Sequence, residues 1–420
     1  MNIMLLGQPR FNSPVRHFVN DDLRLPENII RGVNAPLEGE LLFEIAGPRE
    51  KIYFDPQTTK AGIVTCGGLC PGLNDVIRSL FLELHHAYGV MDVIGFRGGY
   101  KGLDPVLGKE PYILTTELVD GIHKKGGTFL GTSRGPVDIA LAVNNLIKRK
   151  INILFVVGGD GTQRGAYELL KEAKKRGYPL SVVGVPKTID NDVPFVSQTF
   201  GYNTAIEEAS KVLDRAHTEA RSVENGISLV KLMGRHAGFI TAGATMASQD
   251  VNFALVPEVP FKMEGPKGFL AALKKRIQNR AHALIVVAEG AGQDLIENTH
   301  PEIDASGNIK SKDIGLYLSE SIIKYFKKEQ IPIVMRYMDP SYIVRSSPAN
   351  AEDSILCDLF ARNAVHAAMA GKTGVVIGYM HDQFVHVPVE LLSGRKKLMD
   401  PNSMIWNGTL ASTGQSIKFE

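Results

Sequence analysis

The chain has 420 residues, of which 44% are hydrophobic and 22% are charged, and its formal net charge is +2. That length predicts two or three domains, and the composition is typical of an ordinary globular protein. The balanced charge argues against a nucleic-acid partner and against a polybasic membrane-binding surface.

The cysteines and the terminal residues predict the compartment. Cys66, Cys70 and Cys357 are too few for a disulfide framework, which indicates a reducing environment. Cys66 and Cys70 have CxxxC spacing without a second pair, which argues against zinc. The N-terminal apolar run is too short for a signal peptide, and the longest apolar stretches, such as ALIVVA (283–288), are strand-length. We therefore expect a cytoplasmic protein with no membrane span.

In chain order, residues 1–58 are rich in Pro, Asn and scattered charge, and we expect them to form an extension packed on the main body. From Lys60 onward, short apolar runs alternate with amphipathic segments. AGIVTC (61–66) predicts a buried strand, and the following helix has one apolar face, made by Leu73, Val76, Ile77, Leu80, Phe81 and Leu84. Further strands are predicted at 93–96, 153–157, 182–185, 227–232, 253–256, 283–288, 331–335 and 374–380, and helices at 166–176, 204–219, 266–280, 313–328 and 352–370.

Fully apolar strands alternating with helices predict parallel sheets that are covered on both faces. We expect an α/β fold with two doubly wound, Rossmann-like domains around a cleft, and ligands beyond the carboxyl ends of the strands. The predicted parts are an N-terminal extension, two α/β domains and a C-terminal segment packing on the body, at 1–58, 59–200 with 346–390, 201–345, and 391–420.

The loop GGDGTQRGA (158–166) follows a predicted strand and opens a helix. Its glycines let the backbone approach a phosphate, and the helix start offers unpaired N–H groups and a positive dipole end. Asp160 is then placed to hold Mg²⁺ against a polyphosphate. The loop is not a Walker A motif, because no GK[ST] follows, and a purely structural turn is the alternative.

Two more loops have similar features. GGLCPG (67–72) is a second glycine-rich turn between a strand and a helix, for which a tight turn without ligand is the alternative. GTFLGTSRGP (127–136) ends in Arg134 and Gly135, which would place a guanidinium near a phosphate or a purine.

The stretch VPKTIDNDVP (185–194) follows the predicted strand at 182–185. Asp190 lies two residues from Asp192 and three from Lys187, which fits a general base beside a phosphate-binding cation. The alternative is an Asx-turn, in which these side chains cap backbone groups. Three phosphate-type loops at successive strand ends favour the catalytic interpretation.

Read in this order, GGLCPG, GGDGT and PKTIDND make the chain resemble the 6-phosphofructokinases. KLMGRHAG (231–238), VVAEG (286–290) and RYMDPSYIVR (336–345) agree, and the resemblance runs from about residue 60 to residue 388. Within the family the chain is most similar to the long type found in spirochaetes and trypanosomes. That type is related in sequence to the pyrophosphate-dependent enzymes but uses ATP.

The resemblance implies a glycolytic enzyme in which Asp190 deprotonates the 1-hydroxyl of fructose 6-phosphate. Thr188 would hold the transferring phosphoryl group close to Lys187 and Arg235, and Asp192 would support the loop. The implied sugar-phosphate residues, mainly from the domain at 201–345, are Thr188, Ile189, Asp190, Met233, Gly234, Arg235, Glu289, Tyr342, Ile343, Val344 and Arg345, with Arg336 reaching in from a neighbouring subunit. The implied ATP-binding residues of the other domain are Gly67, Tyr100, Arg134, Gly135, Gly159, Asp160, Gly161 and Thr162, with Asp160 on Mg²⁺. A homotetramer or homodimer with shared sugar-phosphate sites is also implied.

Two positions bear on the phosphoryl donor. Family members that use pyrophosphate have aspartate at the place of Gly161, where a carboxylate would occupy and repel the space of the α-phosphate. Glycine favours ATP. Lys187 resembles the pyrophosphate-dependent group, whereas the short bacterial ATP enzymes have glycine there. The long ATP-dependent type combines both features.

Other positions depart from the short bacterial enzymes. Those enzymes have arginine at the place of Gly226, which puts one contact with the 6-phosphate in doubt, with Arg221 as an unsupported substitute. They have histidine at the place of Tyr342. Of their two effector-binding arginines only Arg78 is matched here, because Leu82 holds the other place, so the bacterial ADP effector site is not expected to be intact.

Two other classes of protein share part of this pattern. Lipid and NAD kinases also have GGDGT after a strand, but they lack TIDND and the MGR segment. A non-catalytic regulatory paralogue would bind nucleotide or sugar phosphate, but such chains typically lose the base or the magnesium ligand. The presence of Asp190, Asp160, Arg235 and Lys187 favours an active enzyme.

Overall fold

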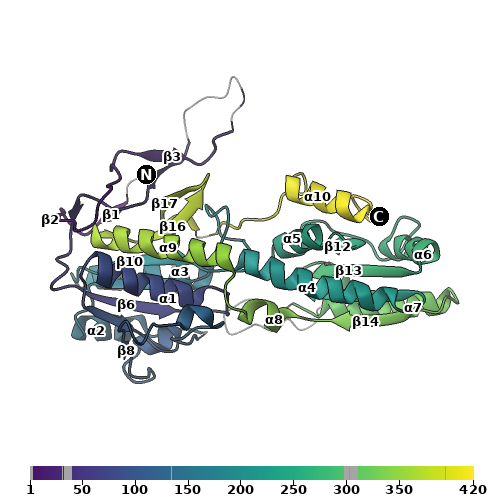
Figure 1. The fold of residues 1–420 in the computed structure, drawn as a ribbon, viewed down its shortest axis with the longest axis horizontal. Helices are drawn as coiled ribbons and strands as arrows, with labels where there is room; N and C mark the ends of the chain where they lie inside the picture. The colour runs from purple at the N-terminus through teal and green to yellow at the C-terminus, as the bar shows by residue number, and fades with distance from the viewer. Residues whose placement is uncertain are drawn as a thin grey trace. The chain divides into compact units, whose positions relative to one another are not determined.

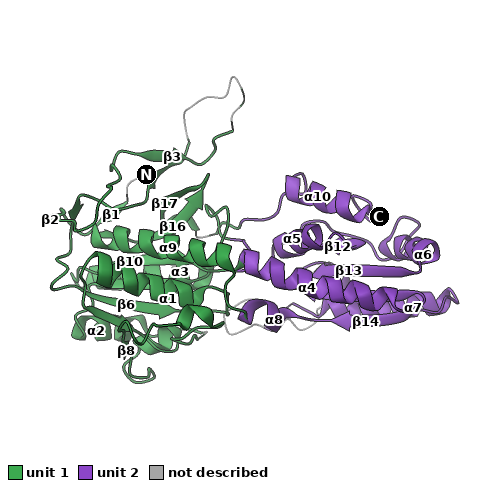
Figure 2. Cartoon of the chain, in the orientation of Figure 1, with its two compact units in different colours: residues 1–188, 193–201, 347–396 green, residues 189–192, 202–346, 397–420 purple. Residues whose placement is uncertain are grey.

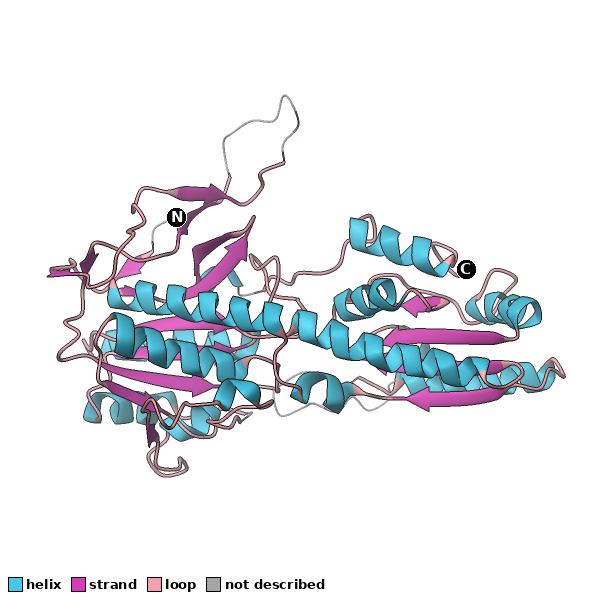
Figure 3. Ribbon diagram, in the orientation of Figure 1, coloured by secondary structure: helices cyan, strands magenta, loops and turns pink. Residues whose placement is uncertain are grey.

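The computed structural model describes residues 3–30, 32, 40–133, 135–297, 302, 311–392 and 394–420. The chain forms two compact units. Unit 1 comprises Met1–Thr188, Val193–Gly201 and Ser347–Lys396, and unit 2 comprises Ile189–Asp192, Tyr202–Ser346 and Lys397–Glu420 (Figure 2). Each unit contains its own sheet flanked by helices (Figure 3), so the predicted α/β class is confirmed.

Unit 1 is built on a nine-stranded sheet with the order β3-β4-β17-β16-β10-β9-β6-β7-β8. Its five central strands are parallel: β16 (Val375–Met380), β10 (Ser181–Pro186), β9 (Ile153–Gly158), β6 (Lys60–Thr65) and β7 (Asp92–Gly95). Antiparallel strands extend the sheet on both sides: β17 (Gln383–Pro388), β4 (Leu42–Ile45), β3 (Arg24–Pro26) and β8 (Tyr112–Ile113).

Helices cover both faces of this sheet. On one face α1 (Leu73–Leu82), which continues into a π-helical turn at Glu83–Ala87, lies beside α9 (Ala351–Met369) (Figure 1). On the other face α2 (Ile139–Lys148) and α3 (Asp160–Lys175) pack together. The apolar residues between this second pair and the sheet form a core that includes Val64, Leu146, Leu154, Val156 and Leu169.

Unit 2 contains a four-stranded, fully parallel sheet with the order β12-β13-β11-β14. The strands are Phe253–Leu255, His282–Ala288, Gly226–Leu232 and Val334–Met338, respectively. Helices α4 (Tyr202–Arg221) and α5 (Phe239–Ser248) pack on one face, and α6 (Phe269–Arg280) and α7 (Ile314–Lys328) pack on the other. Helix α8 (Ser341–Ser346) follows β14, and α10 (Met404–Thr413) packs on α5.

Most predicted strands agree with the structure to within a residue or two, but β14 does not. It was predicted at 331–335 and is observed at Val334–Met338. Pro332 has no N–H to donate to a sheet, and its carbonyl accepts a hydrogen bond from Asn225 Nδ2 at 2.9 Å. The ladder with β11 therefore starts only at Val334, opposite Gly226.

Helix starts and some whole helices also differ from the prediction. The helix predicted at 166–176 starts at Asp160, so its first turn is made by the glycine-rich loop itself. Helices α2, α5, α8 and α10 were not predicted. The sequence of α5, FITAGATMAS, has little polar character because α4 and α10 cover it in addition to the sheet, and its helical periodicity is correspondingly weak.

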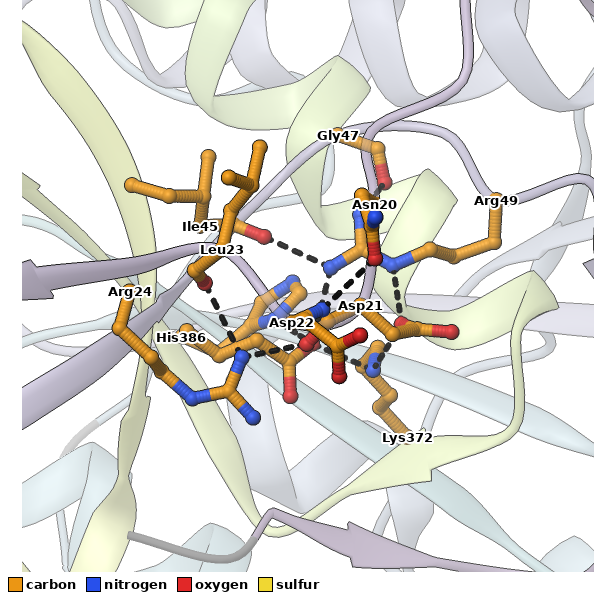
Figure 4. Close-up of polar contacts among 11 residues, drawn as sticks. Asn20, Asp21, Asp22, Leu23, Arg24, Ile45, Gly47, Arg49, Lys372 and His386 are labelled. Atoms are coloured by element: carbon orange, nitrogen blue, oxygen red, sulfur yellow. Dashed lines mark hydrogen bonds and ion pairs between the residues drawn. The ribbon is translucent and has the colours of Figure 1, made fainter.

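The segment before residue 59 is part of unit 1. It supplies β3 and β4 to the main sheet, and it pairs β1 (Met4–Leu5) with β15 (Lys372–Thr373) and β2 (Phe11–Asn12) with β5 (Lys51–Ile52). A buried ionic cluster helps to hold it there, and Figure 4 shows Arg49, Lys372 and His386 in this cluster.

Glu44 is the carboxylate at the centre of that cluster. Its Oε1 accepts hydrogen bonds from Lys372 Nζ at 2.5 Å and Arg49 Nη2 at 2.8 Å, and it lies 3.1 Å from His386 Nδ1. The side chains of Arg49 and Lys372 are only 4% and 5% exposed, and Asp21 supplies a second carboxylate to both. Burial alone would raise the pKa of the Glu44 carboxyl, but the hydrogen bonds and charges of His386 and Lys372 hold it well below its usual range.

Glu44→Gln should destabilise unit 1 by about 3 kcal/mol, because it leaves two buried cations without their central counter-charge. The pKa of Glu44 is lower in the folded protein, so its stabilising contribution is present above the ordinary carboxyl pKa and is lost on acidification. Chemical denaturation at neutral pH measures the effect. The exposed Glu50 offers a matched control, and Glu50→Gln should change the stability by less than about 0.5 kcal/mol. Equal stabilities of the two variants would contradict the role given to Glu44.

Candidate active site

In unit 1, the turn after β9 presents the start of α3. Gly159 precedes the helix, and Asp160 in its first turn is exposed and pairs with Arg164 at 3.1 Å. Among the described residues, a Cβ added at Gly161 would have only the Arg164 guanidinium within 4 Å, at 3.8 Å. The helix start therefore combines N–H groups, a positive dipole end and open space, which suits an anion.

Buried polar contacts fix this helix start. Tyr100 donates from its hydroxyl to the carbonyl oxygen of Thr162 at 2.6 Å, and a Cβ at Gly165 would come within 2.7 Å of the Tyr100 ring. Gln163 Nε2 donates to Gly158 at 2.9 Å and to Val185 at 3.3 Å, which joins the ends of β9 and β10. Tyr100, predicted to bind nucleotide, is thus also a support of the helix start.

The turn after β6 lies next to Lys187. Gly67 has φ +85°, and a Cβ there would lie 3.5 Å from Lys187 Nζ. That ammonium is largely buried and donates to the carbonyl oxygen of Gly68 at 2.8 Å. Thr132 Oγ1 donates to the carbonyl oxygen of Gly67 at 2.7 Å, so the loop at 127–136 meets the same turn. Gly135 is exposed in this loop, and Arg134 lies outside the described residues.

The cysteine at the end of β6 has no nucleophilic character. Burial raises the pKa of the Cys66 thiol to about 12, against the opposing charge of Lys187. All three cysteines are buried as free thiols.

Directly after Thr188 the chain passes from unit 1 into unit 2. Thr188 belongs to unit 1, where its carbonyl oxygen accepts from Thr199 Oγ1 at 2.8 Å. Residues Ile189–Asp192 belong to unit 2, with the Ile189 side chain buried and Asp190 half-buried. Asn191 has φ +55°, a left-handed conformation that asparagine tolerates better than most residues.

In unit 2, two strand ends bring predicted residues together. Met233, Gly234 and Arg235 follow β11, and Glu289 follows β13. Gly290 donates its N–H to the carbonyl oxygen of Gly234 at 3.1 Å. Burial raises the pKa of the Glu289 carboxyl, and the positive charges of Arg235, Lys231 and Arg345 oppose this shift. Glu289, Arg235 and Arg345 therefore act on one another within one charged cluster.

The remaining predicted residues lie on α8 and β14. The Arg345 guanidinium lies 4.8 Å from the centre of the Tyr342 ring, which is 74% exposed. Val344 is buried, so only its backbone can reach a ligand, whereas Ile343 is exposed. Arg336 is exposed on β14 and pairs with Glu219 at 3.3 Å.

Gly226 has a structural reason to lack a side chain. It is the first residue of β11, and a Cβ there would fall on the carbonyl oxygen of Ala220. An arginine cannot occupy this place without moving the backbone. Arg221 is the last residue of α4.

One charged network, centred on Lys231, was not predicted from the sequence. Lys231 pairs with Asp313 and with Asp339, each at 2.9 Å, and Tyr337 donates from its hydroxyl to Asp313 at 3.0 Å. Although burial works against it, the hydrogen bonds that Lys231 donates to both carboxylates raise the pKa of its ammonium. The one sequence feature that could have indicated this network is the lysine inside the apolar run ISLVKL.

Magnesium fits the helix start in unit 1. Mg²⁺ is commonly held by one or two carboxylates together with substrate phosphates and water, and Asp160 supplies an exposed carboxylate at an anion-binding turn. Among the described residues, no three His, Cys, Asp or Glu side chains gather as a metal site of their own. No helix within the described ranges is long and apolar enough to cross a membrane.

The family model described as Phosphofructokinase matches residues 60–368. The chain belongs to the phosphofructokinase family. This confirms the resemblance drawn from the glycine-rich and TIDND motifs. Phosphofructokinases are phosphotransferases, so the enzyme prediction is confirmed with it.

Relatives extend over nearly the whole chain. A protein of Borreliella burgdorferi, named ATP-dependent 6-phosphofructokinase, is 45% identical and is aligned over 99% of this chain and 96% of its own length. A Trypanosoma cruzi protein of the same name is 42% identical, over 94% of this chain and 81% of its own. Among solved structures, the pyrophosphate-dependent phosphofructokinase of Marinobacter aquaeolei has a TM-score of 0.70 at 20% identity, covering 85% of this chain and 92% of that chain, which shows the shared fold.

Gly290→Ala should destabilise unit 2 by about 1–3 kcal/mol, because the new Cβ would fall on the carbonyl oxygen of Arg235. Gly161→Ala is the matched control, since its Cβ would enter open space in the first turn of α3, and it should stabilise by about 0.4–1 kcal/mol. Thermal unfolding of both variants measures the difference. Equal melting temperatures of Gly290→Ala and Gly161→Ala would contradict the close approach of the loops after β11 and β13.

Proposed function

We propose that this chain is an ATP-dependent 6-phosphofructokinase, which transfers the γ-phosphoryl group of Mg-ATP to the 1-hydroxyl of fructose 6-phosphate and yields fructose 1,6-bisphosphate and ADP. The observation that carries the proposal is the stretch after β10, where Lys187 lies against the glycine turn after β6 and Asp190 follows three residues later. A phosphate-neutralising cation is thus placed close in the chain to a carboxylate that can serve as base.

Unit 1 supplies the donor site in this proposal. The N–H groups from Gly159 to Thr162 and the positive end of α3 hold phosphate oxygens, and Lys187 neutralises part of their charge. Asp160 would hold Mg²⁺, which neutralises charge on the β- and γ-phosphates when it is bound. Gly67, Tyr100, Gly135 and Arg134 complete the proposed nucleotide residues.

Unit 2 supplies the acceptor site. Arg345 and Tyr342 bind the 6-phosphate, and Glu289 accepts hydrogen bonds from sugar hydroxyls beside Met233 and Gly234. Arg235 lies in the charged cluster of Glu289 and stabilises the transferring phosphoryl group. Ile189 and the backbone of Ile343 and Val344 line the site, and Thr188 contacts the transferring group.

The proton movement is assigned to Asp190. As the 1-hydroxyl oxygen bonds to the γ-phosphorus, the bond from that phosphorus to the bridging oxygen breaks, and its electron pair leaves with ADP. Asp190 accepts the hydroxyl proton in this step. The chain otherwise acts by positioning the reactants and by neutralising charge.

ATP is favoured as donor over pyrophosphate. Gly161 leaves open space at the start of α3, where a carboxylate would repel the α-phosphate. Eight relatives that are 42–47% identical to this chain are named ATP-dependent 6-phosphofructokinases. Lys187 supports pyrophosphate as the alternative donor, because the pyrophosphate-dependent group shares it.

We further propose a homotetramer or homodimer in which Arg336 contributes to the sugar-phosphate site of a neighbouring subunit. Arg336 is exposed on β14 and pairs only loosely with Glu219 at 3.3 Å, so it is available for a phosphate.

Asp190→Asn should lower kcat by about 10²- to 10⁴-fold, the range for loss of a general base, with little change in the KM of either substrate. The measurement is steady-state turnover in an assay that couples fructose 1,6-bisphosphate or ADP to a nicotinamide signal. Asp120→Asn removes an exposed carboxylate of unit 1 and should leave kcat unchanged. A near-normal kcat for Asp190→Asn would remove this residue from the role of base.

Gly161→Asp should lower kcat/KM for ATP by about 100-fold, because two unit charges ~4 Å apart repel by about 4 kcal/mol at an effective dielectric of 20, and Mg²⁺ screens part of this. Gly161→Ala adds a Cβ without charge and should lose much less. Initial velocities with ATP at saturating fructose 6-phosphate measure both variants. An unchanged KM for ATP in Gly161→Asp would show that Gly161 does not face the nucleotide.

A further inference from the structure

The residues that begin the C-terminal part of unit 2 hold the loop that carries Asp190. Lys397 donates its backbone N–H to the carbonyl oxygen of Asp192 at 3.2 Å. The Lys397 ammonium lies 5.2 Å from the centre of the Phe239 ring, and the Asp192 carboxylate is the charge that acts on it. Both the backbone and the side chain of Lys397 thus engage the loop two residues from the proposed base.

Glu258 joins the same segment to a second part of the acceptor site. Its Oε1 accepts the N–H of Met399 at 2.9 Å and the N–H of Gly238 at 3.0 Å. Gly238 ends the KLMGRHAG stretch and precedes α5, which starts with Phe239. Residues 397–399 therefore connect the loop of Asp190 to the loop of Arg235. We call these three residues the C-terminal clasp.

The clasp is firmly anchored by the residues after it. Trp406 of α10 is 1% exposed, and Thr409 donates to the carbonyl oxygen of Ala242 in α5. Gln415 exchanges two hydrogen bonds with the backbone of Ala254 in β12, at 2.6 and 3.1 Å. Phe419 is 3% exposed and packs in the core between the sheet and α6. The position of Lys397 is set by this packing rather than by a mobile tail.

The contacts of Lys397 lie directly after a turn in the loop. Asn191, between Asp190 and Asp192, adopts a left-handed conformation there, which asparagine tolerates. The hydrogen bond from the Lys397 N–H to the Asp192 carbonyl oxygen, and the attraction between the Lys397 ammonium and the Asp192 carboxylate, act on the residue that follows this turn.

We propose that Lys397 is a positioning residue for phosphoryl transfer, and that the C-terminal clasp holds Asp190 in the geometry in which it accepts the proton. This rests on the proposed function. A misplacement of ~1 Å in a catalytic group costs about 10²-fold in rate, so a contact that fixes the loop acts on kcat more than on binding.

The charge state of Lys397 agrees with this role. Burial lowers the pKa of its ammonium to about 8, and the Asp192 carboxylate opposes the shift. Glu258, the carboxylate that contacts the clasp at Met399, is engaged with the N–H groups of Gly238 and Met399. The ammonium is therefore charged at neutral pH and loses its charge as the pH rises through about 8, which should appear as an alkaline limb in kcat.

Three variants test the proposal by steady-state kinetics across this pH range: Lys397→Met, Lys397→Arg and the matched control Lys396→Met. Lys396 is exposed and precedes the clasp. Lys397→Met should lower kcat by about 10- to 100-fold, with the KM of both substrates changed less than about twofold. Lys397→Arg keeps a charge at all these pH values, so it should retain most of kcat and lose the alkaline limb. A wild-type kcat in Lys397→Met, or an unshifted alkaline limb in Lys397→Arg, would overturn the proposal.

Amide hydrogen exchange tests the same contact without any activity. Peptides covering residues 189–192 should exchange faster in Lys397→Met than in wild type, and Lys396→Met should match wild type. Unchanged exchange of the loop in Lys397→Met would overturn the clasp. A wild-type protein without phosphofructokinase activity would instead refute the proposed function, and the exchange experiment would still decide whether Lys397 holds the loop.

Discussion

The strands of a parallel sheet all end at the same edge, and this constraint places the central candidate functional groups of each unit. Within a central strand the backbone donors and acceptors are used by the ladder and most side chains are buried, so most of the polar groups lie where a strand stops. In unit 1 the ends of β6, β9 and β10 carry the two glycine turns and Lys187. In unit 2 the ends of β11 and β13 carry Arg235 and Glu289.

The loop after β10 contains residues of both units. Thr188 is the last residue of unit 1 before the loop, Ile189–Asp192 belong to unit 2, and unit 1 resumes at Val193. Lys187 is held within unit 1 through Gly68, whereas Asp192, two residues after Asp190, is held within unit 2 through the N–H of Lys397. In the proposed mechanism the base and the sugar-phosphate residues belong to the same unit, which suits a base that takes its proton from the acceptor.

Much of the fold could be predicted because strands that are buried on both faces appear in the sequence as uninterrupted apolar runs. ILFVV and ALIVVA are uninterrupted apolar runs, and they form β9 and β13 with every residue from 153 to 158 and from 283 to 288 buried. The N-terminal 58 residues contain no such apolar runs at their strands, because the strands described there are two to four residues long and partly exposed. Their place in the sheet depends on distant partners such as Lys372 and His386.

The candidate site residues also fall into those that could be predicted from the sequence and those that could not. Asp190, Lys187 and the glycine turns could be predicted because each is a local pattern with a chemical reason. The pairing of Lys231 with Asp313, 82 residues away, and the contact of Lys397 with Asp192 have no local pattern, since only the folded chain brings them together. For Val344 the motif predicted a binding residue, but the side chain is buried in α8 and leaves only its backbone for a ligand.

Initial velocities of the wild-type protein with fructose 6-phosphate and either ATP or pyrophosphate, each with Mg²⁺, test the central claim most directly. The open space at Gly161, with no carboxylate to repel an α-phosphate, predicts turnover with ATP and a higher kcat/KM for ATP than for pyrophosphate. Equal or faster turnover with pyrophosphate would contradict the donor assignment. Absence of fructose 1,6-bisphosphate with both donors would contradict the assignment of the chain as an active phosphofructokinase.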